Sequence, residues 1–174
     1  MRPKIYISGI DNLTDARYFS AMGADYLGFQ MDDPAMLIKA LGMIDWVEGP
    51  EIVAETSSLS LSEGIKDALK TGHFQHIKVG AFMPLEEIDV PVGYIFSEAL
   101  DVPSIPAQVP VYEAKAGQSK YEENCFFKFA IQDLLDQPIP HVAGIILSAG
   151  TEEKIGFKDF DQFDQFFEKL DDQF

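Results

Sequence analysis

Four carboxylate side chains follow predicted strands closely enough to meet at one edge of a sheet. Each ends an apolar strand or comes directly after one, and a glutamine lies beside the first: Asp32, Glu55, Glu98 and Glu113, with Gln30. The carboxyl ends of parallel strands share one edge, so these side chains would form an acidic rim. Such a rim suits a cationic or hydroxyl-rich ligand, or a divalent ion held by oxygen ligands. The alternative is scattered surface charge in a chain with 29 acidic residues.

Small residues end two other predicted strands. Ser8 precedes Gly9 at the end of the first strand, and Ser148-Ala149-Gly150 ends the last. A turn of small residues can direct backbone N–H groups at an anion. A serine hydroxyl needs a neighbouring base before it becomes reactive. Without one, Ser8 is simply a small residue at a tight strand end.

Eight predicted strands position these residues. They run over 4–10, 24–31, 51–55, 76–81, 92–96, 109–114, 126–131 and 142–147. A first helix begins after a cap at Asp11 or Asn12 and ends before Gly23. Further helices are expected over 35–46, 61–70 (with a cap at Ser60) and 157–170.

This alternation predicts an α/β fold, a compact (β/α)8 barrel that forms one domain over residues 1–174. Each unit has only about 22 residues, roughly one strand, one three-turn helix and two short loops. The region 83–108 holds four prolines and no helical spacing, so one or two outer helices are expected to be missing or shortened. The competing open, doubly wound sheet lacks its glycine-rich G-x-G-x-x-G fingerprint.

The amino-acid composition limits which classes of partner we expect the protein to bind. The chain has 13 basic and 29 acidic residues, a net charge of −16. An acidic chain repels nucleic acid and anionic membrane surfaces, so we expect neither as a partner. There is no apolar run of about 18 residues, and the start, MRPKIYISGI, lacks the apolar segment of a signal peptide. We therefore expect a cytoplasmic protein in which most of the charge maintains solubility.

Cysteine and phenylalanine usage gives two smaller expectations. Cys125 is the single cysteine, which excludes an intrachain disulfide and a cysteine-based metal cluster. It is expected in the core, before the seventh strand. The phenylalanines of the last helix recur at core spacing, but Phe166-Phe167 and Phe174 leave a homodimer open beside a monomer.

Three blocks of sequence carry a family resemblance. Tyr6–Ala16 reads YISGIDNLTDA, Gly23–Phe29 reads GADYLGF, and Ser148–Asp159 contains SAGTE followed by GFKD. In this order and spacing they resemble K-I-C-G-[IL]-T-N-x-E-D-A, G-A-D-x-[LV]-G-F and S-S-G-V-E … P-G-x-K-D of the phosphoribosylanthranilate isomerase family. The middle of the chain matches only in its rhythm of strands.

The resemblance implies a (β/α)8 enzyme of tryptophan biosynthesis that performs an Amadori rearrangement without a metal or organic cofactor. It places Ser8 at the position of the general base, which is a cysteine in the family. It places Glu113 at the position of the general acid, which is an aspartate there. It also implies that Ser148, Ala149 and Gly150 contact the phosphate of a small-molecule substrate.

Several positions depart from the family pattern. A thiol can be tuned to a thiolate, whereas the Ser8 hydroxyl cannot be without a base. The family's S-G-G-L turn after the seventh strand is replaced by residues 131–136, which include Asp133 and Asp136. Its basic loop after the second strand is replaced by QMDDP at residues 30–34, and Q-L-H-G in the fourth strand by IKVG at residues 77–80. His76, which opens the fourth strand, is expected at the opposite end of the barrel.

Two hypotheses follow. In the first, the chain is an isomerase of this family that uses Ser8, Glu113 and the 148–150 turn. In the second, it is a shortened paralogue that has kept the barrel, lost the reaction and binds another small ligand or a protein partner. The acids near the expected anion site favour the second, because they repel a phosphate.

Overall fold

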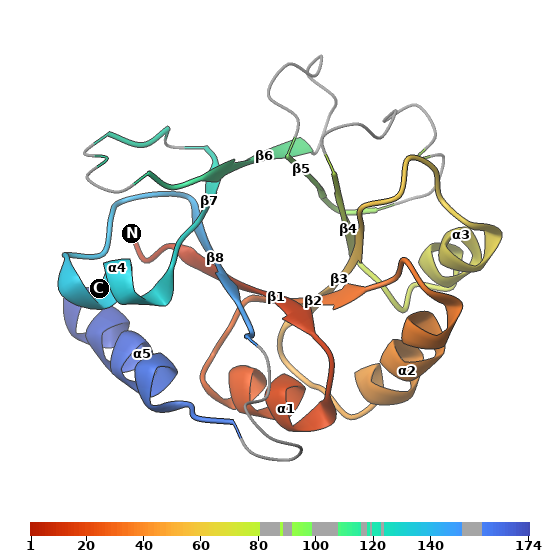
Figure 1. Cartoon of the computed structure of the whole chain (residues 1–174), viewed down its shortest axis with the longest axis horizontal. Coiled ribbons are helices and arrows are strands. Elements are labelled where there is room, and N and C mark those ends of the chain that lie inside the picture. Colours follow the sequence, from red (N-terminus) through yellow and green to blue (C-terminus); the bar gives the residue numbers. More distant parts are fainter. Residues whose placement is uncertain are drawn as a thin grey trace.

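Eight parallel strands follow one another around a closed barrel, which confirms the predicted fold (Figure 1). The computed structural model describes residues 1–80, 88, 92–98, 108–115, 118, 120–122, 124–150 and 158–174. The strands are β1 (Lys4–Ile10), β2 (Tyr26–Gln30), β3 (Glu51–Thr56), β4 (His76–Val79), β5 (Ile95–Ser97), β6 (Gln108–Glu113), β7 (Phe126–Lys128) and β8 (Gly144–Ser148). Pairing between β1 and β8 closes the barrel and sets Ser8 opposite Ser148. All eight carboxyl ends therefore meet at one mouth.

Helices cover the part of the barrel from β1 to β4 and the part around β8 (Figure 1). They are α1 (Leu13–Ala21), α2 (Pro34–Ile44), α3 (Glu63–Lys70), α4 (Ile131–Asp136) and α5 (Asp161–Gln173). Side-chain caps begin the first three, at Asn12, Asp33 and Ser62. The cap predicted at Ser60 is therefore wrong, because it is the Ser62 hydroxyl that accepts the Ile65 N–H. Most of the region 83–108, where outer helices were expected to be missing, lies outside the described residues.

The seventh strand is shorter than predicted. It ends at Lys128, and the residues predicted as loop form α4 instead. The helix forms because Leu134 is buried while its polar neighbours remain at the surface, a pattern that six residues display too briefly to be recognised. Lys169 of α5 fixes this helix by donating from Nζ to the carbonyl oxygens of Leu134 and Leu135, at 2.7 and 2.8 Å.

The strands lie between two apolar layers, one inside the barrel and one beneath the helices. The barrel interior is filled by Tyr6, Tyr26, Val53, Phe96, Val111, Phe126 and Ile146. A β-carbon on Gly144 would lie 2.1 Å from the Phe126 ring, so this glycine makes room for the phenylalanine inside a narrow barrel. The second layer lies between strands and helices and includes Cys125, which confirms its predicted burial.

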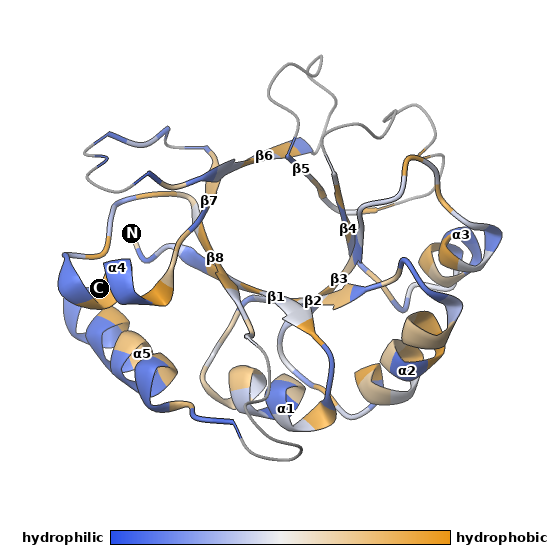
Figure 2. Ribbon diagram, viewed as in Figure 1, coloured by the Kyte–Doolittle hydropathy of each residue, from blue (hydrophilic) through white to orange (hydrophobic). Residues whose placement is uncertain are grey.

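The phenylalanine stripe of α5 also packs in the core, as its spacing predicts. Phe163, Phe166, Phe167 and Leu170 are buried, while hydrophilic residues lie between them along the helix (Figure 2). Within the described part of the chain, no helix combines the length and the apolar character needed to span a membrane.

Candidate functional site

Glu55, near the end of β3, is the most enclosed charged residue of the barrel mouth among those that the structure describes, with 1% of its surface exposed. Four donors reach its carboxylate: Tyr6 Oη and Ser8 Oγ, each 2.6 Å from Oε1, and Gly9 N and Gln30 Nε2, 3.0 and 3.3 Å from Oε2. Ser8 thus has the neighbouring base that its sequence context did not show. The carboxylate fits here because β2 has Gly28, where a β-carbon would lie 2.4 Å from Oε1.

Two lysines continue this arrangement around the mouth. Lys78 Nζ of β4 lies 3.7 Å from Glu55 Oε1 and 3.5 Å from Glu98 Oε1. Lys128 Nζ, at the end of β7, lies 2.5 Å from the same Glu98 oxygen and 3.2 Å from Glu113 Oε1. The contacts therefore form a chain in which carboxylates and ammonium groups alternate, from Glu55 at one end to Glu113 at the other.

The electrostatics of this network differ from the acidic rim that we predicted. Glu55, Glu98 and Glu113 do meet at the mouth, but Lys78 and Lys128 lie between them and leave one net negative charge. Sequence reasoning missed both lysines. A signal was present, because a lysine within an otherwise apolar parallel strand is unusual when both faces of the strand are covered.

Ionisation of the network follows from its pairing. Burial acts to raise the pKa of Glu98, but hydrogen bonding and attraction from Lys128 and Lys78 outweigh it and lower that pKa overall. Burial acts to lower the pKa of Lys128, but Glu98 and then Glu113 raise it. Glu98 and Lys128 are therefore both charged at neutral pH. Tyr6 stays protonated as a donor, because burial, and then the charge of Glu55, raises its pKa well above the usual value.

Two small cavities open between these side chains and share Lys78. One, of about 180 Å³, is lined by Gln30, Glu55 and Glu98 on the β2–β5 side. The other, of about 300 Å³, includes Ser8, Glu113, Lys128 and Ser148. Of the described residues that line the two cavities, only the two lysines are cationic. The mouth can thus offer ammonium groups, a hydroxyl and an exposed carboxylate to one small ligand.

Asp32 belongs to a different cluster. Its carboxylate accepts hydrogen bonds from the hydroxyls of Thr56, Ser57 and Ser58 and from the Ser57 N–H, at 2.6 to 3.2 Å. Burial acts to raise the pKa of Asp32, but these bonds, above all that from Ser57, lower it. Asp32 thus fastens the loop after β3 to the loop after β2, and its partners Thr56 and Ser57 line the smaller mouth cavity, so a role for Asp32 at the mouth stays a prediction.

Two backbone N–H groups of the turn after β8 already have hydrogen-bond partners. Ala149 N donates to Ser8 O at 2.8 Å, and Gly150 N donates to Ser148 Oγ at 3.2 Å. Gly150 has φ of +80°, which favours glycine. Two of the N–H groups proposed for a phosphate are thus already paired, and an anion would have to displace these bonds. Ser148 itself lines the larger mouth cavity.

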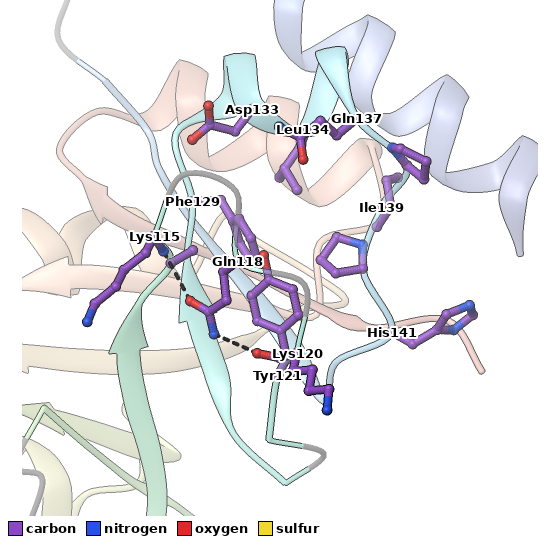
Figure 3. Close-up of a pocket in the computed structure, with 13 residues that line it drawn as sticks. Lys115, Gln118, Lys120, Tyr121, Phe129, Asp133, Leu134, Gln137, Ile139 and His141 are labelled. Atoms are coloured by element: carbon purple, nitrogen blue, oxygen red, sulfur yellow. Dashed lines mark hydrogen bonds between the residues drawn. The ribbon is translucent and has the colours of Figure 1, made fainter.

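A larger cavity lies outside the barrel, between α4, the chain after β6 and residues 137–141 (Figure 3). Its volume is about 750 Å³, and Tyr121, Phe129 and His141 line it with Lys115 and Asp133. Asp133 therefore lines this outer cavity rather than either of the two mouth cavities. Phe129 lines both this cavity and the larger mouth cavity, while Lys78, Glu113 and Lys128 line only the latter of the two.

The remaining candidate residues lie away from the mouth. His76 opens β4, as predicted, and its buried ring contacts Glu51 and accepts the Tyr94 N–H at 2.8 Å. Burial, with a hydrogen bond to Glu122, raises the pKa of Cys125 to about 11, so this thiol is inert at neutral pH. Among the described residues, no group of three or more His, Cys, Asp or Glu side chains is arranged to hold a metal ion.

A solved structure with the same fold gives the comparison. The chain superimposes on phosphoribosylanthranilate isomerase from Thermotoga maritima, in a crystal structure of monomers generated from that dimeric protein, with a TM-score of 0.66. The match covers 98% of this chain and 99% of the other at 17% identity, a level at which the likeness shows the fold. No family model and no curated protein matches this chain. The resemblance read from the sequence blocks thus agrees with the structural neighbour.

Proposed function

We propose that the barrel mouth binds a phosphorylated sugar-like molecule and catalyses an Amadori-type aldose–ketose isomerisation, the chemistry implied by the name of the structural neighbour. The observation that carries the proposal is a chain of contacts in which carboxylates and ammonium groups alternate, at the carboxyl-end face of strands β3 to β7: Glu55, Lys78, Glu98, Lys128 and Glu113. Catalytic residues of (β/α)8 enzymes lie at this face. The two lysines supply attraction for an anionic substrate that the net charge of −16 otherwise repels.

In this proposal Glu113 is the general acid. Its side chain is 74% exposed and contacts Lys128. It can therefore approach a substrate in the mouth cavity of about 300 Å³, which it lines. Glu113 takes a proton from the Lys128 ammonium group, 3.2 Å away, and gives it to the ring oxygen of the sugar as the bond between that oxygen and C1 breaks. The glycosylamine nitrogen supplies the electron pair that forms the open-chain iminium.

Ser8 and Glu55 together take the second proton. The C2–H bond breaks, Ser8 Oγ accepts the proton, and the original hydroxyl proton passes along the 2.6 Å hydrogen bond to Glu55 Oε1. The electron pair of the broken bond neutralises the iminium, and the enol-amine then becomes the amino-ketone. Glu55 is enclosed, so it acts on the substrate only through Ser8.

A fluorescence assay with phosphoribosylanthranilate tests this function. We expect turnover by the wild-type chain and a loss of about 10²–10⁴-fold in kcat for Glu113→Gln, the usual contribution of a general acid. Glu63→Gln, which removes an exposed carboxylate of α3, is the matched control and keeps full activity. Absence of turnover by folded protein, together with failure to rescue a tryptophan auxotroph, overturns the proposal.

A second candidate is a barrel that binds a small ligand without this reaction. It is favoured by the internal pairing of the Ala149 and Gly150 N–H groups, which leaves the expected phosphate turn occupied. On this reading Ser8→Cys restores no isomerase activity, because the phosphate site is absent as well as the thiol. A large gain of activity in Ser8→Cys contradicts it.

A further inference from the structure

Lys78 occupies an unusual place for a lysine. It lies in β4, with 12% of its side chain exposed, and it lines both mouth cavities. Enclosing an ammonium group is costly unless it is closely paired. The contacts of the Lys78 amine therefore decide what it can do at this site.

The two carboxylates near Lys78 are largely committed to other donors. Glu55 Oε1 accepts from Tyr6 and Ser8 at 2.6 Å, and Lys78 Nζ is 3.7 Å away. Glu98 Oε1 lies 2.5 Å from Lys128 Nζ but 3.5 Å from Lys78 Nζ. Among the described residues, Lys78 thus has two bases at 3.5 and 3.7 Å, each of which has a shorter contact with another donor, and a second ammonium group beyond one of them. Enzymes place amine nucleophiles in surroundings of this kind, partly desolvated and beside another cation.

We infer that Lys78 is a nucleophilic amine that forms an imine with a small hydroxy-aldehyde or hydroxy-ketone. The carbonyl carbon would lie in the cavity of about 300 Å³, beside Lys78 Nζ. Ser8 and Ser148 offer hydroxyl groups there, and Glu113 and Lys128 offer a carboxylate and an ammonium group to the ligand's hydroxyls. The small volume restricts the ligand to a short chain.

The reaction needs only an amine, a carbonyl and a base. The Lys78 ammonium gives one proton to Glu98, and the free electron pair of Nζ forms the N–C bond while the carbonyl oxygen takes that proton. The carbinolamine then loses its hydroxyl group as water: a second proton from nitrogen, carried by Glu98, joins the leaving oxygen as the C–O bond breaks. The products are the imine and one water molecule, with no change of oxidation state.

This activity goes beyond the isomerase proposal, because the isomerase mechanism forms no covalent bond to the protein. Labelling of Lys78 without turnover of phosphoribosylanthranilate would support the imine and count against the isomerase. Turnover without labelling would do the reverse. The two proposals therefore fail separately.

Reductive trapping tests the inference. The full chain is incubated with glyceraldehyde or dihydroxyacetone and sodium cyanoborohydride, which reduces an imine to a stable secondary amine, and the modified lysines are located by peptide mass spectrometry. We expect Lys78 to be labelled about tenfold faster than the exposed Lys39, because the cavity holds the reacting groups together. Equal rates at Lys78 and Lys39, or preferential labelling of Lys128, overturn the inference.

Variants separate a reactive amine from a merely accessible one. Lys78→Met loses the fast-labelled site and Lys39→Met does not; if Lys78→Met does not fold, Lys78→Arg keeps the charge without an amine that forms a reducible imine. Lys128→Met frees Glu98 to pair closely with Lys78, so labelling of Lys78 slows relative to labelling of Lys39. An unchanged ratio of the two labelling rates in folded Lys128→Met contradicts the inference.

Discussion

Glu55 brings together groups from three strands. Its carboxylate accepts from Tyr6 and Ser8 of β1 and from Gln30 of β2, while Glu55 itself belongs to β3. A buried charge is tolerated only when its hydrogen-bonding capacity is filled, and removal of one donor exposes the desolvation cost of the remainder. This carboxylate therefore links β1, β2 and β3 at the mouth and gives the Ser8 hydroxyl a neighbouring base.

Tyr6→Phe is expected to lower the free energy of unfolding by about 1.5–3 kcal/mol, the contribution of a hydrogen bond to a charged group. Tyr18→Phe is the matched control, since its hydroxyl also contacts a carboxylate at 2.6 Å, that of Asp164, but at the surface. That variant is expected to cost less than about 1 kcal/mol. Urea unfolding measures both values. Equal losses would show that the enclosure of Glu55 does not strengthen its bond with Tyr6.

The sequence predicted which carboxylates lie at the barrel mouth, but it did not predict the residues that bind them. Glu55, Glu98 and Glu113 were predicted from their places at strand ends, and the structure brings them together. The hydrogen bond between Ser8 and Glu55 depends on the register of β1, β2 and β3, which no local pattern fixes. Only its charge within a short, otherwise mostly apolar segment marks Lys78 in the sequence, and its two carboxylate neighbours come from other strands or loops.

At the scale of elements, α1 and the chain before α5 are joined by an ion pair that is almost completely buried. Lys158 Nζ lies 2.5 Å from Asp15 Oδ2, and the two side chains are 9% and 2% exposed. The ammonium also lies 5.7 and 5.5 Å from the centres of the Phe19 and Phe160 rings. Both residues lie in sequence blocks that carry the family resemblance, Asp15 in the first block and Lys158 in the third, but their separation along the chain hides the contact between them.

Lys158→Met is expected to destabilise the protein by about 3–5 kcal/mol, because it leaves Asp15 buried without its partner. Asp15→Leu combined with Lys158→Met should recover part of this loss, since no unpaired charge remains. Lys4→Met removes the more exposed pair with Asp25 and should cost no more than about 1 kcal/mol. Denaturant unfolding of all three variants checks the order. A double variant less stable than Lys158→Met alone contradicts it.

The elements themselves were predictable where their signals were long. Lys4–Ile10 is predicted and observed with the same bounds, and Asn12 caps the following helix as one of the two predicted candidates. Three-residue strands such as β5 and β7 have ends that depend on their neighbours in the barrel, so their predicted bounds were displaced or too long. The helix α4 depends on contact with α5, which its own six residues do not reveal.

For the whole molecule, pH acts on 29 acidic residues at once, and the mouth network adds its own dependence. Mutual repulsion among the acids changes with pH in any variant that keeps nearly all of them. Glu98 differs because its pKa is lower in the folded chain than in an unfolded one. Its contribution is therefore present above the ordinary glutamate pKa and is lost as pH falls through the lowered value.

The difference in stability between the wild type and Glu98→Gln should accordingly be constant from about pH 7 to 5 and shrink below about pH 4.5. Urea unfolding of both proteins along this pH series measures the difference, and the repulsion common to the two chains cancels. A gap that persists undiminished at about pH 3 would show that Glu98 acts through packing rather than through charge.

Pairing of β1 with β8, which closes the barrel, can form only after most of the chain has been synthesised. Lys4 pairs with Gly144 and Ser8 with Ser148, so the two elements that meet are separated by most of the chain. On a ribosome, β1 emerges early and presents one unpaired edge until the last strand follows, a state that invites association with other chains. The same long separation makes closure entropically late and the folding rate low. Closure of the ring aligns the lysines and carboxylates of the mouth. Until that closure the nascent chain keeps an unpaired strand edge, and it is then most prone to aggregate.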